Sequence, residues 1–127
     1  MTLYATFAKL SLSEYEADLV RRGAVERWIE NLVNAVADIS KIVLSSNKNP
    51  VPYGYADTIR SAALKLNLPK EFWDQFLGWI KLRNLLAHEY LDIKWKKISD
   101  FIQNSEPYFQ NFLEAAKKFL EENELKA

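Results

Sequence analysis

The chain has 127 residues, of which 49% are hydrophobic and 27% are charged. This length suits one domain, spanning residues 1–127, and is too short for two ordinary ones. The sequence has no cysteine, which excludes disulfides, thiolate metal sites and cysteine nucleophiles. Seventeen basic residues balance seventeen acidic ones, whereas a protein that coats nucleic acid along an extended surface is usually more basic.

Cellular location is predicted from what the sequence lacks. No apolar run approaches the roughly 20 residues of a membrane span. Residues 1–12 lack the basic start, apolar stretch and cleavage site of a secretory signal. The absence of cysteine fits a reducing compartment. We therefore expect a cytoplasmic protein that does not contact a membrane.

Helical periodicity runs through most of the chain. Ser11 and Glu14 have the spacing of a capping box at the start of a helix. From about residue 24 to residue 44, apolar residues recur at steps of three and four and form one stripe. The opposite face of this segment is polar and carries Glu26, Arg27, Glu30, Asn31 and Asn34. The pattern predicts a long amphipathic helix that needs a partner.

Residues 45–54 interrupt the pattern, because Ser, Asn, Pro and Gly are concentrated there, and they predict a loop. A short helix is expected over about 56–66. Pro69 suits the first turn of the next helix, which should end between residues 87 and 90. The last helical region is interrupted by Pro107, which predicts a kink or a restart. The sequence thus predicts an all-α fold, an up-and-down bundle of four or five helices.

The stretch from Lys81 to Tyr90 differs from the rest because it gathers Arg83, Asn84, Tyr90 and the only histidine, His88. Histidine takes and gives protons near neutral pH, and arginine binds phosphate through a fork of donors. These side chains suffice to cleave RNA with the substrate's own 2′-hydroxyl as nucleophile. His88 is expected to move the proton and Arg83 to stabilise charge on the phosphate. No metal and no other cofactor is expected.

The charge around this stretch is compatible with RNA. Between residues 81 and 97, five basic residues stand against two acidic ones. A phosphate would therefore meet a local positive field in a protein that is neutral as a whole.

Arg83 and His88 can act on one phosphate only if their side chains converge. On a continuous helix Arg83 and His88 lie roughly 140° apart around the axis. They converge only if the helix ends near Ala87, or if a second copy of the chain supplies part of the site. One histidine can hardly act as base and acid at once, and a two-fold dimer brings two copies of His88 together. The plainer interpretation is that His88 caps a helix end and Arg83 is a surface ion-pair donor.

The octapeptide Arg-Asn-Leu-Leu-Ala-His-Glu-Tyr at residues 83–90 resembles the Arg-X4-His-X-Tyr signature of HEPN domains, specifically the HepT-like toxin branch. Residues 25–39 and 52–57 are similar to the long helix and the connecting loop of that family. The resemblance covers about residues 20–120. It implies a helical bundle that forms homodimers, with the motif at the dimer cleft. It also implies a metal-independent endoribonuclease, often the toxin of a toxin–antitoxin pair.

The resemblance assigns roles to individual residues. Arg83 and His88 are expected to be catalytic and Asn84 to support them, while Asp38 is expected to approach the site from the long helix. The usual partner is a minimal nucleotidyltransferase antitoxin, which uses ATP to attach AMP to the motif tyrosine, here Tyr90. The chain departs from the family at Leu85, a position that is often basic, and this puts strong RNA affinity in doubt.

Two other functions stay open. In the first, the chain is a non-catalytic accessory subunit of a minimal nucleotidyltransferase, and Arg83 and Tyr90 bind a nucleotide phosphate or the partner surface. That function predicts nucleotide or partner binding without RNA cleavage. In the second, the chain is a helical dimerisation module whose motif only caps a helix. Replacing Arg83 by alanine would then alter neither binding nor toxicity.

Overall fold

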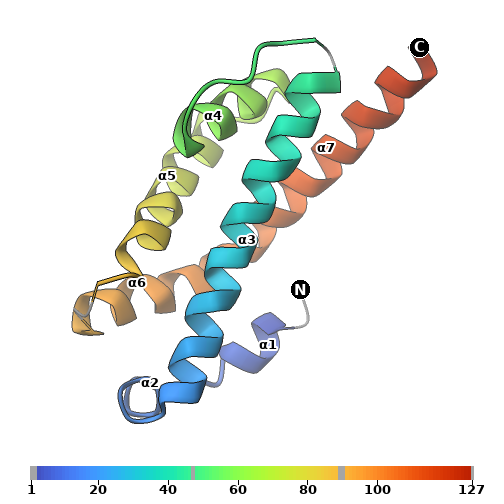
Figure 1. Ribbon diagram of the computed structural model, residues 1–127. Helices are drawn as coiled ribbons and strands as arrows, with labels where there is room; N and C mark the ends of the chain where they lie inside the picture. Colours follow the sequence, from blue (N-terminus) through green and yellow to red (C-terminus); the bar gives the residue numbers. More distant parts are fainter. Residues whose placement is uncertain (1–2, 47, 89–90, 127) are drawn as a thin grey trace.

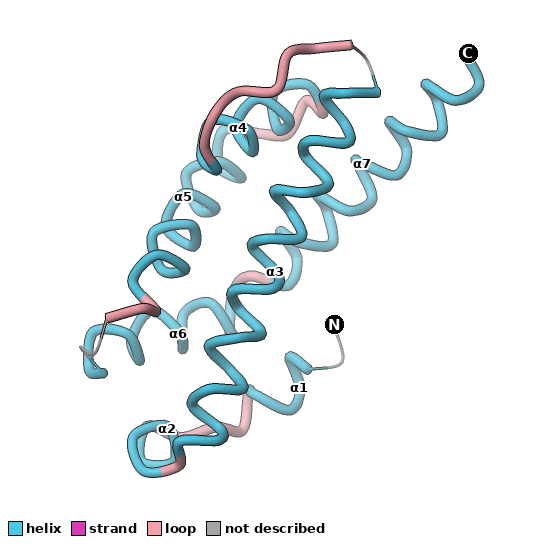
Figure 2. The backbone as a smooth tube through the Cα atoms, viewed as in Figure 1, coloured by secondary structure: helices cyan, strands magenta, loops and turns pink. Residues whose placement is uncertain are grey.

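The computed structural model describes residues 3–46, 48–88 and 91–126, and within them every regular element is a helix (Figures 1 and 2). Two short helices come first, α1 (Leu3–Phe7) and α2 (Leu12–Ala17). Five longer helices follow: α3 (Leu19–Ser46), α4 (Tyr55–Lys65), α5 (Lys70–Leu85), α6 (Leu91–Asn104) and α7 (Glu106–Lys126). The expected all-α class is confirmed. None of the described helices has the length and apolar character needed to cross a membrane.

The long helix α3 is the centre of the arrangement. It contacts α2, α4, α5 and α7, and Figure 1 shows α4 and α5 to its left and α7 crossing behind it. The apolar stripe expected for this segment is buried at Val25, Ile29, Val36 and Val43. These positions are four or seven residues apart, so they lie on one face of the helix and pack into the core.

Side-chain caps fix the starts of α2 and α3. The capping box expected at the start of α2 is confirmed: the Ser11 hydroxyl accepts the Glu14 N–H at 3.2 Å, and the Glu14 carboxylate accepts the Ser11 N–H at 3.2 Å. The Asp18 carboxylate then accepts the N–H groups of Val20 and Arg21, at 3.0 and 3.1 Å. This cap explains why α3 begins at Leu19, before the apolar stripe that predicted it.

The loop between α3 and α4 places Tyr55 at the start of α4. Gly54 has a φ of 87°, a conformation that favours glycine, and directly precedes the helix. The Thr58 hydroxyl donates to the carbonyls of Pro52 and Gly54, at 3.1 and 2.7 Å. These two hydrogen bonds fix the end of the loop to the first turns of α4.

Aromatic side chains from α3, α5, α6 and α7 fill the core. The Trp79 and Phe101 rings meet edge to face with their centroids 5.7 Å apart, and Phe109 meets Phe101 in the same way at 5.6 Å. The restart expected near Pro107 is confirmed, because α6 ends at Asn104 and α7 begins at Glu106. Proline is tolerated there, since the first turn of a helix leaves its N–H groups unpaired.

Candidate active site at the end of α5

The helix that carries Arg83 ends before His88. The last residue of α5 is Leu85, and the Leu86 N–H still donates to the Leu82 carbonyl at 3.1 Å. The His88 N–H donates to the Leu85 carbonyl at 2.9 Å, which closes a turn. The helix thus ends between Arg83 and His88. On a continuous helix the two side chains would lie on different sides, so this break is what their convergence requires.

The positions of the two candidate side chains differ. Arg83 is half-buried in the last turn of α5, whereas His88 is exposed on the turn that follows. No hydrogen bond joins their side chains, although the structure describes both residues. Tyr90, expected to be the modified residue, lies outside the described residues.

Three side chains hold the Arg83 guanidinium. Its Nε–H donates to Asn34 Oδ1 at 3.2 Å and its Nη1–H donates to Asn84 Oδ1 at 3.1 Å. Its Cζ lies 4.7 Å from the centre of the Tyr55 ring, a cation–π contact. Asn84, predicted as a supporting residue, is thus in direct contact with Arg83.

Asn34 and Tyr55 were not among the predicted site residues. Asn34 Oδ1 accepts both Arg83 Nε–H and the Tyr55 hydroxyl, so one amide oxygen joins α3, α4 and α5. The periodicity of α3 placed Asn34 on its outer face. The available signal was its spacing from Asp38, because residues four apart lie on one face of a helix.

Asp38 is exposed on α3, one turn beyond Asn34. Its carboxylate acts on Tyr55 through charge, so it lies near the cluster. Burial raises the pKa of the Tyr55 hydroxyl, the Arg83 guanidinium lowers it, and the Asp38 carboxylate raises it, with a raised pKa as the net result. Tyr55 is therefore neutral at pH 7 and can donate its proton to Asn34.

The Arg83 guanidinium keeps donors for a ligand. Arginine has five N–H donors in a planar fork. Within the described part of the chain, Nη2 forms no hydrogen bond and no carboxylate forms an ion pair with Arg83. Among the described residues nothing occupies the donors of Nη2, and such donors suit the binding of an anion.

A cavity of about 350 Å³ adjoins this cluster at Tyr55. Its wall includes Lys41 on α3, Tyr53 in the loop and Thr58 on α4. The Tyr53 side chain is 99% exposed. An exposed aromatic ring beside a lysine suits the stacking of a base next to a bound phosphate.

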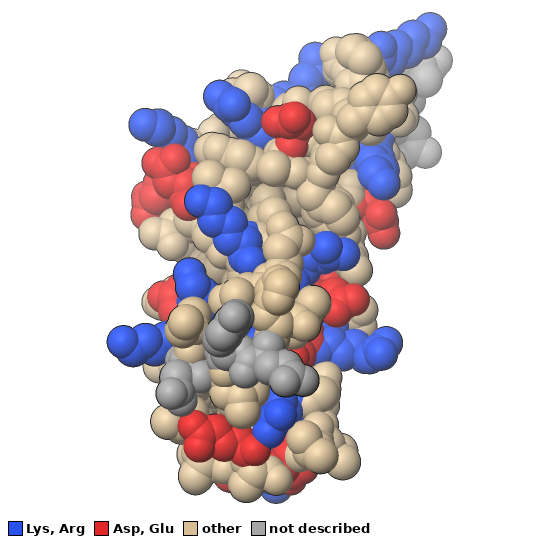
Figure 3. All heavy atoms as spheres, turned by 60° about the vertical axis from the view of Figure 1, so that its left-hand side comes forward, with Lys and Arg blue, Asp and Glu red and all other residues tan. Residues whose placement is uncertain are grey.

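The positive field expected between residues 81 and 97 is weaker than the sequence suggested. Lys94 is only 4% exposed and forms an ion pair with Glu26 of α3 at 3.3 Å. Its charge is neutralised inside the protein. Lys81, Lys96 and Lys97 are exposed. Figure 3 shows Lys and Arg side chains interspersed with Asp and Glu side chains on one face.

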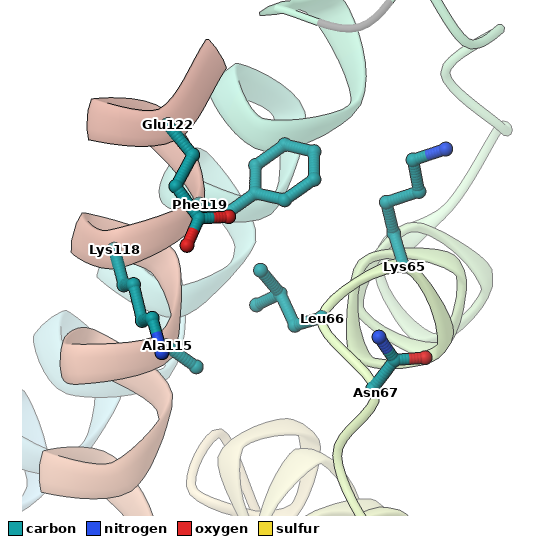
Figure 4. A pocket seen from close by; sticks show the side chains of 7 residues that line it. All are labelled: Lys65, Leu66, Asn67, Ala115, Lys118, Phe119 and Glu122. Atoms are coloured by element: carbon teal, nitrogen blue, oxygen red, sulfur yellow. The ribbon is translucent and has the colours of Figure 1, made fainter. Parts of the chain in front are cut away.

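A second cavity, of about 230 Å³, lies between the end of α4 and α7 (Figure 4). Leu66 and Phe119 lie across it from each other, and Asn67, Lys118 and Glu122 also line it. None of its lining residues belongs to the stretch 81–90, and it lies at the opposite end of α5 from Arg83. In the parts of the chain that are described, no three His, Cys, Asp or Glu residues gather into a possible metal site.

Comparison with known proteins identifies the family. No curated protein and no solved structure matches the chain significantly. The family model described as "Ribonuclease HepT-like" matches residues 2–116, which is most of the chain. The matched range includes Asn34, Tyr55, Arg83 and His88. The chain thus belongs to the HepT-like family.

Proposed function

We propose that this protein is a metal-independent endoribonuclease of the toxin type. The observation that carries the proposal is the Arg83 guanidinium, fixed by Asn34, Asn84 and Tyr55 but without a carboxylate partner among the described residues. It stands five residues before an exposed imidazole in a chain of a family described as ribonucleases. A preorganised cation is suited to stabilise charge that develops on a phosphate.

The proposed reaction uses only groups of the protein and of the RNA. An imidazole takes the proton of a ribose 2′-hydroxyl, and the 2′-oxygen attacks the adjacent phosphorus. The bond from phosphorus to the 5′-oxygen breaks, and that oxygen takes a proton from an imidazolium. The products are a 2′,3′-cyclic phosphate and a 5′-hydroxyl end. Arg83 binds the phosphate oxygens while their charge grows.

The base and the acid are proposed to come from two chains. Each chain has a single histidine, His88. In a two-fold homodimer, two copies of one turn can face each other, so that one imidazole acts as base and the other as acid. Asn84 and Asp38 support the site, Asn84 by holding Arg83 and Asp38 by its negative charge near Tyr55.

Regulation is proposed to act on Tyr90, and this rests on the place of Tyr90 in the motif. The partner is a minimal nucleotidyltransferase antitoxin. The tyrosine oxygen attacks the α-phosphorus of ATP, pyrophosphate leaves, and AMP stays on the tyrosine. The added phosphate competes for the positive charge of Arg83 and blocks the site.

The test is cleavage of labelled RNA by purified protein in the presence of EDTA. We expect the wild type to cleave and to leave 2′,3′-cyclic phosphate ends. His88→Ala and Arg83→Ala should each lower the rate by about 10²–10⁴-fold. Equal activity of the wild type and His88→Ala would identify a contaminating nuclease. Binding of a nucleotide or a nucleotidyltransferase without any cleavage would instead favour the accessory subunit.

A further inference from the structure

An ion pair between a buried lysine and a partly buried glutamate lies behind the turn that carries His88. Lys94 of α6 is 4% exposed, and its Nζ lies 3.3 Å from Glu26 Oε2 of α3. The same carboxylate oxygen accepts the hydroxyl of Tyr15 at 2.6 Å, and Tyr15 is fully buried on α2. The network therefore ties α2, α3 and α6 together beneath the surface.

Lys94 also reaches the turn itself. Its Nζ donates to the Leu86 carbonyl at 3.3 Å. The turn from Leu85 to His88 is closed by the hydrogen bond of the His88 N–H to the Leu85 carbonyl. The Leu86 carbonyl belongs to the central peptide of this turn. The ammonium group therefore holds the one peptide whose orientation defines the turn.

The backbone angles of Leu86 identify the turn type that the hydrogen bond from Lys94 favours. Leu86 has φ −60° and ψ −23°, close to the type I values of about −60° and −30°. A type II turn has the same φ but a ψ of about +120°, which turns the central carbonyl away. Lys94 bonds the carbonyl only in the first orientation, so the contact opposes both a flip of this peptide and an opening of the turn that carries His88.

Stability alone is a weak explanation for this network. Replacing a buried ion pair by apolar side chains of similar volume is often neutral or stabilising, because burial removes two charges from water. Here Lys94 donates a hydrogen bond to the Leu86 carbonyl, and an apolar side chain cannot make that bond.

We propose that Lys94 and Glu26 are positioning residues, which fix the turn at residues 85–88 through the Leu86 carbonyl and thereby set the place of the His88 imidazole relative to Arg83. The catalytic part of this inference rests on the proposed ribonuclease function. The structural part of the inference, that the ion pair holds the turn, is independent of that function.

The principal variant replaces the whole network with apolar side chains: Tyr15→Phe, Glu26→Leu and Lys94→Met together. No charge is then left buried alone, and the unfolding midpoint should stay within about 4 °C of the wild type. If the triple variant does not fold, Glu26→Gln with Lys94→Met keeps an acceptor for Tyr15 and serves in its place. Lys96→Met is the matched control, because Lys96 is exposed on the same helix.

The first measurement is amide hydrogen exchange at His88. We expect exchange to accelerate by about tenfold or more in the triple variant, while amides in the middle of α3 keep their rates. His88 is the only histidine, so its ring gives a single set of NMR signals that should shift in the same samples. The control Lys96→Met should change neither.

The second measurement is RNA cleavage. Misplacing a catalytic group costs turnover more than binding, so kcat should fall about 10- to 100-fold while KM changes less than about threefold. A folded triple variant with unchanged kcat overturns the proposal, and so does a lower kcat with unchanged exchange at His88. If the wild type does not cleave RNA, the proposed function falls, and exchange at His88 still decides whether the pair holds the turn.

Discussion

Asn34 holds two neighbouring helices through one oxygen atom. Its amide oxygen accepts from Arg83 and from Tyr55, and neither contact was predictable from the periodicity of α3. Periodicity separates apolar faces from polar ones, but it does not show which polar side chain meets another helix. Glu26 is a second example, since it belongs to the same polar face and is paired with the buried Lys94.

The role of Asn34 can be tested by removing its side chain. In Asn34→Ala the Arg83 guanidinium loses a hydrogen bond, and Tyr55 loses its acceptor. We expect RNA cleavage to fall about tenfold, which corresponds to about 1.4 kcal/mol, close to the lower end for a hydrogen bond to a charged group.

Asn31→Ala is the matched control, because Asn31 is exposed on the same helix. It should cleave RNA like the wild type. Equal rates for the two variants would show that Asn34 does not hold Arg83 in the working protein.

The helices themselves were largely predictable, and their ends less so. The stripe on α3, the loop before α4 and the restart before α7 follow from apolar spacing and from proline and glycine. The start of α3 was missed, because Asp18 caps it ahead of the first residue of the stripe. The end of α5 was placed a few residues late, because nothing local marks it: Leu86 and Ala87 are both good helix formers, and Lys94 holds the turn from α6.

A contact between elements predicts the response of the fold to alkaline pH. Tyr4 of α1 shares a hydrogen bond of 2.6 Å with Ser105, at the junction of α6 and α7. Burial raises the pKa of the Tyr4 hydroxyl from 10.0 to about 12, and the hydrogen bond to Ser105 lowers it in part. The neutral hydroxyl is thus favoured in the folded chain, whereas the unfolded chain ionises it near pH 10.

We therefore expect Tyr4 to contribute its full stability below pH 10, and this contribution to be lost as the pH rises from 10 through about 12. Urea unfolding followed by circular dichroism at several pH values measures it. Tyr4→Phe should make the fall in unfolding free energy less steep over this interval. Tyr53→Phe is the control, because the Tyr53 ring is fully accessible to water. Identical slopes for the wild type and Tyr4→Phe would contradict the expectation.

At the scale of the whole molecule, the proposed mechanism needs more groups than a single chain supplies. The proposed mechanism requires a base and an acid, and the chain contains one histidine. Arg83 and His88 are described in the structure, but no hydrogen bond brings their side chains together. The motif was readable in the sequence because its residues are contiguous. The surface of a proposed dimer leaves no comparable pattern, since a surface is assembled from residues that are far apart in the sequence.

We expect the protein to sediment as a homodimer, with twice the chain mass of 14.8 kDa. Wild-type chains mixed and refolded with an excess of His88→Ala chains should lose most of their activity, because mixed dimers have one imidazole. Independent sites would leave the activity per wild-type chain unchanged. A monomer at the concentrations that cleave RNA would contradict the shared site.

The hydrogen bond between Tyr4 and Ser105 joins residues that are 101 positions apart. A ribosome must therefore release most of the chain before the N-terminal segment can reach its place. Until then, the apolar stripe of α3 lacks the cover that α5 and α7 provide. The nascent protein should depend on chaperones during this interval, and α1 should reach its place only after Ser105 has left the ribosome.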